Sequence, residues 1–382
     1  MRMSRWLALG GGVGAAIIVA GWNLAQGAYS PRERTYYIAA DTLTWDYAPG
    51  GVDAISGQDP TPFGELFLRS GKKQIGTRYK KVLYREYTDS TFTQLKPRPA
   101  EWEHLGALGP LVRAVVGDTI RVVFRNNGPH PFSLHPHGVF YDKRSEGAPY
   151  QDGTAAADGV DDGVPPGGTH VYVWPVPERA GPTTHEGSSA FWMYHSHTAE
   201  TRDVNSGLIG PMIVTAAGRA RPDGTPDDID REIIVAFNEV DENDSWFFEE
   251  NLTTYASEPE SVTPAERFSF ASTFFVSNLR ETINGWSFGH TPKFTMHVGE
   301  RVRWYTMSAT NFEIHAPHWH GNTVIVNGMR TDVTALLPMG MMIADMVPDN
   351  PGTWLIHCHV GPHLNAGMQA RFAVEPALRA VR

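Results

Sequence analysis

The chain has 382 residues, enough for two or three domains, and its 41% hydrophobic content is typical of a soluble globular protein. Its 32 Lys and Arg residues against 42 Asp and Glu residues give a formal net charge of −10, which argues against binding to the phosphate backbone of nucleic acids. The single cysteine, Cys358, excludes an intrachain disulfide and the cysteine-rich zinc folds.

The N-terminal residues 1–30 combine two early arginines, Arg2 and Arg5, with an apolar run over residues 6–20. This composition predicts an export signal or, if it is retained, an N-terminal membrane anchor. We therefore expect an exported protein, periplasmic or extracellular, that is tethered to a membrane if the anchor stays.

From Tyr36 onward, short apolar or alternating runs are separated by Gly, Pro, Asn and Asp, and no long stretch carries apolar residues at helical spacing. The pattern predicts an all-β fold made of β-sandwiches. A polar segment rich in Gly, Pro and Asp divides the chain. We expect one domain over residues 31–217, a linker over 218–230 and a second domain over 231–382.

The two halves of the chain repeat each other in their histidines. Each half carries two His-x-His pairs: His135 with His137, His195 with His197, His318 with His320, and His357 with His359. Because alternate residues of a strand point to the same face, each pair can present two imidazoles in one direction. Eight convergent imidazoles exceed what one ion binds, so the repeat predicts a multinuclear metal centre.

The second half adds four further metal-binding side chains around the same segment, His315, Cys358, His363 and Met368. Two imidazoles, one thiolate and a weak thioether are the ligand set of a blue copper site. Counted from the aligned pairs, the corresponding positions of the first half are Phe132, Ser196, Thr201 and Ser206. We therefore expect one blue copper site, in the second half only.

Several phrases of the sequence, among them "HPHGVFYDKRSEGAPYQDGT", "SGLIGPMIV", "NPGTWLIHCHV" and "HLNAGM", resemble those of multicopper oxidases. The match to ceruloplasmin-like members extends over nearly all of residues 36–375. The resemblance implies two cupredoxin-like domains, each a Greek-key β-sandwich. It also implies copper as the cofactor, with one type 1, one type 2 and two type 3 ions in each functional unit.

The resemblance assigns a copper ion to each histidine. The type 2 ion would be held by His135 and His318. One type 3 ion would be held by His137, His195 and His359, and the other by His197, His320 and His357. The type 1 ion would be held by His315, Cys358, His363 and Met368. In two-domain relatives the cluster lies between neighbouring subunits, so the resemblance further implies a homotrimer.

The implied reaction couples a small reducing substrate to O2. Single electrons would enter at the type 1 copper and pass through Cys358 to His357 and His359, and four of them would reduce O2 to water at the cluster. Asp152, in "YQDGT", matches the family's carboxylate near the type 2 copper, and we expect it to deliver protons.

The substrate is open at this point. A laccase-like oxidation of phenols or aromatic amines is the main expectation, because it needs only an accessible edge of a type 1 histidine. A metal oxidase is the alternative. Iron-oxidising relatives use positions that read Val276, Glu281 and Pro362 here, of which only Glu281 can bind a metal ion. A methionine-rich stretch offers soft ligands for Cu(I) in a cuprous oxidase, Met339, Met341, Met342 and Met346.

Two further alternatives remain. A copper nitrite reductase would have its blue site in the first domain, and a binding module without catalysis need not keep a full ligand set. Oxygen uptake with a phenol, compared with nitrite turnover, separates these two from an oxidase.

Overall fold

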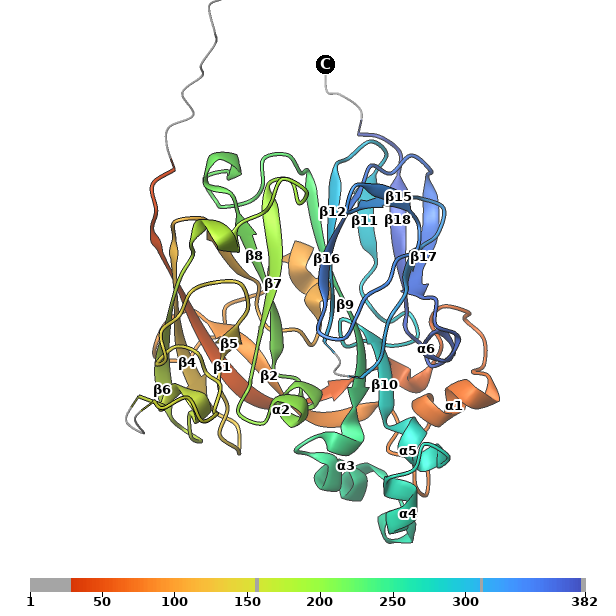
Figure 1. Ribbon diagram of the computed structural model, residues 1–382. Coiled ribbons are helices and arrows are strands. Elements are labelled where there is room, and N and C mark those ends of the chain that lie inside the picture. Colours follow the sequence, from red (N-terminus) through yellow and green to blue (C-terminus); the bar gives the residue numbers. More distant parts are fainter. Residues whose placement is uncertain (1–28, 155–157, 310–311, 379–382) are drawn as a thin grey trace, which may run out of the picture.

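The structure is a computed structural model that describes residues 29–154, 158–309 and 312–378. It shows two β-rich halves side by side (Figure 1). The first half holds two four-stranded sheets. In the order of their hydrogen-bonded neighbours, the strands are β2 (Arg78–Tyr87), β1 (Glu33–Asp46), β4 (Thr119–Asn126) and β6 (Thr169–Pro175) in one sheet, and β3 (Val112–Val115), β8 (Ile209–Thr215), β7 (Ser189–His195) and β5 (His135–Pro136) in the other.

The second half holds one six-stranded and one four-stranded sheet. The first runs β10 (Leu279–Ile283), β9 (Arg231–Asp241), β12 (Val302–Ser308), β16 (Met341–Met346), β14 (Val324–Val326) and β15 (Met329–Thr331). The second runs β11 (Phe294–His297), β18 (Gln369–Glu375), β17 (Gly352–Cys358) and β13 (Pro317–Trp319).

The repeat seen in the sequence extends to the strand pairing. β1 lies parallel to β4 as β9 lies parallel to β12, and β3 lies parallel to β8 as β11 lies parallel to β18. β5 and β13 hold the first histidine of the first pair in each half, and they lie antiparallel to β7 and β17, which hold the first histidine of the second pair. The expected all-β fold is therefore confirmed.

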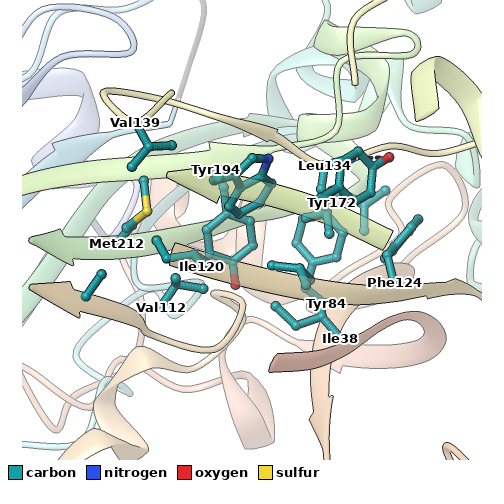
Figure 2. Close-up of a cluster of buried hydrophobic side chains, with 14 of the residues drawn as sticks. Ile38, Tyr84, Val112, Ile120, Phe124, Leu134, Val139, Tyr172, Tyr194 and Met212 are labelled. Atoms are coloured by element: carbon teal, nitrogen blue, oxygen red, sulfur yellow. Dashed lines mark hydrogen bonds between the residues drawn. The ribbon is translucent and has the colours of Figure 1, made fainter. Parts of the chain in front are cut away.

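Alternation along the strands builds each core. In the first half, Ile120, Val122 and Phe124 of β4 are fully buried and pack with Tyr172 of β6 and Tyr194 of β7 (Figure 2). His195 follows Tyr194 directly, so the ring that fills the core and the ring that reaches the end of the sheet come from successive residues of one strand.

The two halves meet across a shared apolar cluster. Phe191 and Met193 of β7 pack with Ile234 of β9 and with Tyr305 and Met307 of β12. Near this cluster, His104 of the 3₁₀ segment Ala100–Leu105 is buried and accepts a hydrogen bond from the backbone N–H of Ile234. The halves are thus joined by buried side chains as well as by the chain between them.

Short helices connect the strands, and the sequence pattern did not predict them. They are α1 (Pro62–Leu68), α2 (Glu200–Ser206), α3 (Phe248–Tyr255), α4 (Pro264–Arg267), α5 (Thr273–Ser277) and α6 (Gly361–Asn365). α3, α4 and α5 gather at one end of the second half (Figure 1). Helices of eight residues or fewer are too short to show a repeating apolar stripe, and local caps such as the capping box of Thr263 and Glu266 define them instead.

The polar segment between the halves is held in place by its own hydrogen bonds. Arg219 Nε donates to Asp227 Oδ1 at 2.8 Å, and Arg221 Nη2 donates to the carbonyl of Ile229 at 2.7 Å. Among the described residues, no helix combines the length and apolar character that a membrane crossing requires. Residues 1–28, which carry most of the expected export signal, lie outside the described ranges, so that prediction stays a prediction.

Candidate metal centre

Strands β5 and β7 bring the four histidines of the first half together. His135 of β5 is paired in register with His195 at the end of β7. The Nε2 atoms of His137 and His195 are 3.1 Å apart, and the ring centroids of His135 and His197 are 5.1 Å apart. The alternation expected from the sequence therefore turns all four imidazoles toward one place.

Strands β13 and β17 do the same in the second half. His318 of β13 is paired in register with His357 of β17. The Nε2 atoms of His320 and His357 are 2.9 Å apart, and the ring centroids of His318 and His359 are 5.3 Å apart. In both halves the two closest nitrogens belong to histidines that the family resemblance assigns to one ion.

Backbone carbonyls orient four of these rings through Nδ1. The donor–acceptor pairs are His135 to Glu146 O at 2.7 Å, His195 to Ser196 O at 3.1 Å, His318 to Asp332 O at 2.9 Å and His357 to Cys358 O at 2.8 Å. A hydrogen on Nδ1 leaves the Nε2 lone pair free, which is the tautomer a metal ligand needs.

The surroundings keep several of these rings neutral. Burial, followed by the neighbouring imidazoles, lowers the pKa of His195 to about 3 and that of His137 to about 4. Burial also lowers the pKa of His357. Neutral imidazoles with aligned lone pairs fit the donor set that copper ions require.

The two sets of histidines remain separate within one chain. All ring contacts and hydrogen bonds between these eight residues, each of which lies in the described part, stay within one half. Each half thus offers four imidazoles on its own, and the structure does not bring the eight together.

A third centre surrounds Cys358 in the second half. Its Sγ lies 3.5 Å from Nδ1 of His363 and 3.8 Å from Nδ1 of His315. Met368, fully buried in the same core cluster, accepts the backbone N–H of Cys358 through its carbonyl oxygen. Sulfur and imidazole donors that converge in this way fit a blue copper ion.

Burial also sets the protonation of this centre. It lowers the pKa of His315 to about 3 and raises the pKa of the Cys358 thiol. Without a metal ion, a neutral thiol therefore sits between neutral imidazoles. A bound cation favours the thiolate, so metal binding releases a proton here.

The first half lacks these ligands, but the equivalent positions differ from those expected by counting forward from the histidine pair. The backbone N–H of Cys358 donates to the carbonyl of Met368, and that of Ser196 donates to the carbonyl of Leu208. The N–H of Met368 donates to the carbonyl of His363 as that of Leu208 donates to the carbonyl of Asp203.

Leu208 and Asp203 therefore replace Ser206 and Thr201 as the first-half counterparts of Met368 and His363. The reason is that α2 has seven residues and α6 has five, which shifts the spacing by two. The prediction of a single blue copper centre is unaffected by this correction, because Phe132, Ser196, Asp203 and Leu208 do not form its ligand set.

Three glutamates face the outer edge of His363, and the sequence pointed to only one of them. Nε2 of His363 lies 3.8 Å from Glu281 Oε1 and 4.0 Å from Glu313 Oε2. Glu239 of β9 lies directly opposite Glu281 of β10 in the antiparallel pairing, and its carboxylate joins the same group. Glu239 and Glu281 are about forty residues apart in the chain and are brought together by the register of β9 and β10. Their spacing in the sequence therefore could not reveal this group.

Burial raises the pKa of both opposed glutamates. Burial raises the pKa of Glu239 to about 7. Burial, followed by the neighbouring Glu239 carboxylate, raises the pKa of Glu281 well above its usual range. Glu281 is 4% exposed, and its Oε2 has no hydrogen-bond partner. Val276 on α5 and Pro362 on α6 contribute no ligand, as expected.

Asp152 lies in an exposed loop of the first half. Its Oδ2 pairs with Lys143 Nζ at 2.9 Å, and its Oδ1 accepts the N–H of Thr154 at 2.7 Å. These contacts lower the pKa of the carboxyl well below its usual range. Lys143 also pairs with Glu146, whose carbonyl accepts Nδ1–H of His135. Asp152 is therefore linked to the candidate type 2 ligand only through intermediates, and its role in proton delivery stays a prediction.

The methionine-rich stretch does not form one site. Met339 and Met341 pack against the cluster between the halves, whereas Met342 and Met346 pack against the core that contains Cys358. Successive residues of β16 point to opposite faces, which separates the thioethers. The structure therefore offers no convergent methionine site for Cu(I) in this stretch.

Comparison with known proteins agrees with this geometry. Two family models described as "Multicopper oxidase" match residues 105–218 and 258–378. The chain is 43% identical over 346 residues to "Ferroxidase HEPHL1" of Homo sapiens, 40% identical over 347 residues to "Hephaestin" of Mus musculus and 37% identical over 357 residues to "Ceruloplasmin" of Homo sapiens.

These matches cover 90%, 90% and 91% of the chain but only 29%, 29% and 33% of the relatives. The chain thus spans about a third of the length of the curated relatives it matches.

Solved structures show a similar fold at low identity. "Multicopper Oxidase mgLAC (data2)" matches with a TM-score of 0.57 at 19% identity, and "Crystal structure of Blue Copper Oxidase from Nitrosomonas europaea" with a TM-score of 0.55 at 18% identity. Each match covers 91% of this chain and 86% of the other. The expected pair of cupredoxin-like domains is confirmed, and copper is the cofactor that the family implies. Taken with the two family models and the long alignments, these findings establish that the chain belongs to the multicopper oxidase family.

Proposed function

We propose that this protein is a ferrous oxidase, which takes single electrons from Fe(II) at the type 1 centre and uses four of them to reduce O2 to water. The bound copper ions would supply the one-electron chemistry and the reduction of O2. The curated relatives named as ferroxidases support this metal-oxidase alternative better than the laccase-like reading.

The observation that carries the proposal is the environment of His363. One nitrogen of the imidazole, Nδ1, faces the Cys358 sulfur, and the other, Nε2, faces the carboxylates of Glu281 and Glu313. A cation held by these carboxylates would lie one imidazole ring away from the type 1 ligand set. Carboxylate oxygens attract a divalent cation, whereas a neutral phenol gains nothing from them.

Glu239 strengthens the case, because it places a second, half-buried carboxylate directly opposite the buried carboxylate of Glu281. Two opposed carboxylates cannot both stay ionised in a buried place unless a proton or a cation lies between them. Among the described residues, Oε2 of Glu281 has no hydrogen-bond partner, which supports a place for a bound cation at this oxygen. Glu313 is exposed and marks the side from which an ion would arrive from solvent.

The test compares Fe(II), Cu(I) and a phenol as electron donors for the copper-loaded protein and for Glu281→Gln and Glu239→Gln. We expect each substitution to lower kcat/KM for Fe(II) by about tenfold or more, roughly 1.4 kcal/mol, because a neutral amide holds a cation poorly. Turnover of the phenol and the blue absorption band should not change, since neither glutamate belongs to the type 1 ligand set. Glu258→Gln, at a partly exposed glutamate paired with Lys72, is the matched control.

Two results would overturn the proposal. One is a wild-type kcat/KM for the phenol more than about tenfold above that for Fe(II). The other is an Fe(II) rate that survives both glutamine substitutions.

We also propose that the chain works as a homotrimer in which each cluster is built from two subunits. The support is the separation of the half-sites: His137 and His195 share one position, but their third assigned ligand, His359, belongs to the other set. A ring in which the first domain of one subunit faces the second domain of the next completes three clusters at once.

A further inference from the structure

In the first half, the positions equivalent to the blue copper centre are occupied by a hydrogen-bond network. In the second half, the N–H of Ala316 donates to Cys358 Sγ at 3.3 Å. In the first half, the N–H of Ser133 donates to Ser196 Oγ at 3.1 Å in the same way. The hydroxyl of Ser196 then donates to Asp203 Oδ2 at 2.6 Å, so a carboxylate occupies the position that His363 has in the other half.

Asp203 is fully buried, and the donors around it leave neither oxygen without a partner. Oδ2 also accepts the backbone N–H of Ala199 at 2.9 Å, and Oδ1 accepts the indole N–H of Trp246 at 2.8 Å. Charge-assisted hydrogen bonds to a buried carboxylate are strong and directional. Asp203 is therefore held in one orientation by three donors, two from the segment 196–199 and one from Trp246.

This network ends on the copper ligands of the first half. Ser196 lies between His195 and His197, and its carbonyl accepts Nδ1–H of His195. The hydroxyl of Ser133, whose backbone N–H binds Ser196, accepts the backbone N–H of His197 at 3.0 Å. A change at Asp203 thus reaches His195 through Ser196, and His197 through Ser196 and Ser133.

The other end of the network lies in the second half. Trp246 follows β9 and precedes α3, and its ring stacks on His130 with a centroid separation of 3.8 Å. The guanidinium of Arg202 lies 4.8 Å from the same ring. α2, which carries Asp203, and α3 lie at the same end of the molecule (Figure 1). The Trp246–Asp203 bond therefore ties the first-half histidines to the second domain of the same chain.

We propose that Asp203 is a positioning residue for the trinuclear copper cluster: from the vacant blue copper position it fixes Ser196, and through it the imidazoles of His195 and His197, against Trp246 of the second domain. Partners that orient metal ligands commonly change metal affinity by about 10- to 100-fold when they are lost. This proposal does not depend on which substrate the oxidase uses.

Asp203→Asn is the sharpest test, because the side chain keeps its shape. In either orientation its NH2 group meets a donor, the N–H of Ala199 or the indole N–H of Trp246, so one hydrogen bond is replaced by a repulsive contact. Titration of copper into metal-free protein should show cluster ions bound about tenfold more weakly or worse, with the blue band unchanged. In the metal-free protein, hydrogen exchange of the Trp246 indole N–H should accelerate.

Two further variants make the outcome decisive. Trp246→Phe keeps the aromatic ring and removes only the donor, so it should weaken cluster copper in the same direction even if Asp203→Asn fails to fold. Asp244→Asn, a partly exposed acid that pairs with Arg202, is the matched control and should leave copper binding unchanged. Unaltered affinity for cluster copper in Asp203→Asn, or in Trp246→Phe if only that variant folds, would overturn the proposal.

Discussion

At the scale of single residues, the two halves of the repeat have a thiol and a hydroxyl at equivalent positions. Cys358 and Ser196 hold the same place in their halves, and each accepts a backbone N–H from a residue that lies just before the neighbouring strand, Ala316 before β13 and Ser133 before β5. Cys358 faces two imidazoles, whereas Ser196 faces the carboxylate of Asp203. The cysteine thiol therefore supplies a ligand for a soft metal ion, whereas the serine hydroxyl donates a hydrogen bond to a carboxylate.

Cys358→Ser should remove the blue band and one copper ion per chain, and electron entry with it. The cluster ions should stay, because the backbone carbonyl of residue 358, not its side chain, orients His357. Metal analysis together with visible absorption measures both. Blue colour that persists in the serine variant, or loss of the cluster ions along with the type 1 ion, would contradict the assignment of Cys358.

At the scale of elements, strand alternation made most of the site predictable. A period of two puts both histidines of each pair on one face, so the four pairs, the repeat and the ligand set at Cys358 followed from spacing alone. The positions of Asp203 and Leu208 did not, because α2 is two residues longer than α6. The Glu239–Glu281 pair was also missed, since it arises from the register between β9 and β10.

The 3₁₀ segment Ala100–Leu105 provides a pH test at this scale. Burial lowers the pKa of His104 to about 4, below the ordinary value of 6.5. Between about pH 4 and pH 6.5, His104 is therefore protonated in the unfolded chain but neutral in the folded protein. The free energy of unfolding is therefore unaffected by protonation of His104 above pH 6.5. It falls as the pH decreases toward 4, by up to about 3 kcal/mol.

The measurement is the free energy of unfolding of copper-free protein between pH 7 and pH 4, for the wild type and for His104→Gln. The glutamine variant should lose less stability over this range, because one group that titrates on unfolding is gone. Other buried histidines contribute equally to both proteins, so the difference between the two curves isolates His104. Parallel curves would show that His104 is not held neutral by burial.

At the scale of the whole molecule, one chain carries two sets of four histidines that remain separate from each other. The candidate type 1 ligands lie in the second half, and each half carries four imidazoles whose contacts with one another stay within that half. The resemblance implies that subunits share the cluster, and this stays a prediction. The separation of the two histidine sets within one chain could not be predicted from sequence, because it depends on how the two domains pack.

The most direct test of this account is complementation between two variants, His137→Ala and His320→Ala, each of which damages one half-site of every chain. Alone, neither should take up O2 with a reducing donor. Co-expressed in equal amounts and assembled at random, they should recover about one quarter of the wild-type rate, because one subunit contact in four pairs two intact halves. No recovery in mixed assemblies, or a wild-type protein that turns over as a monomer, would contradict a cluster shared between chains.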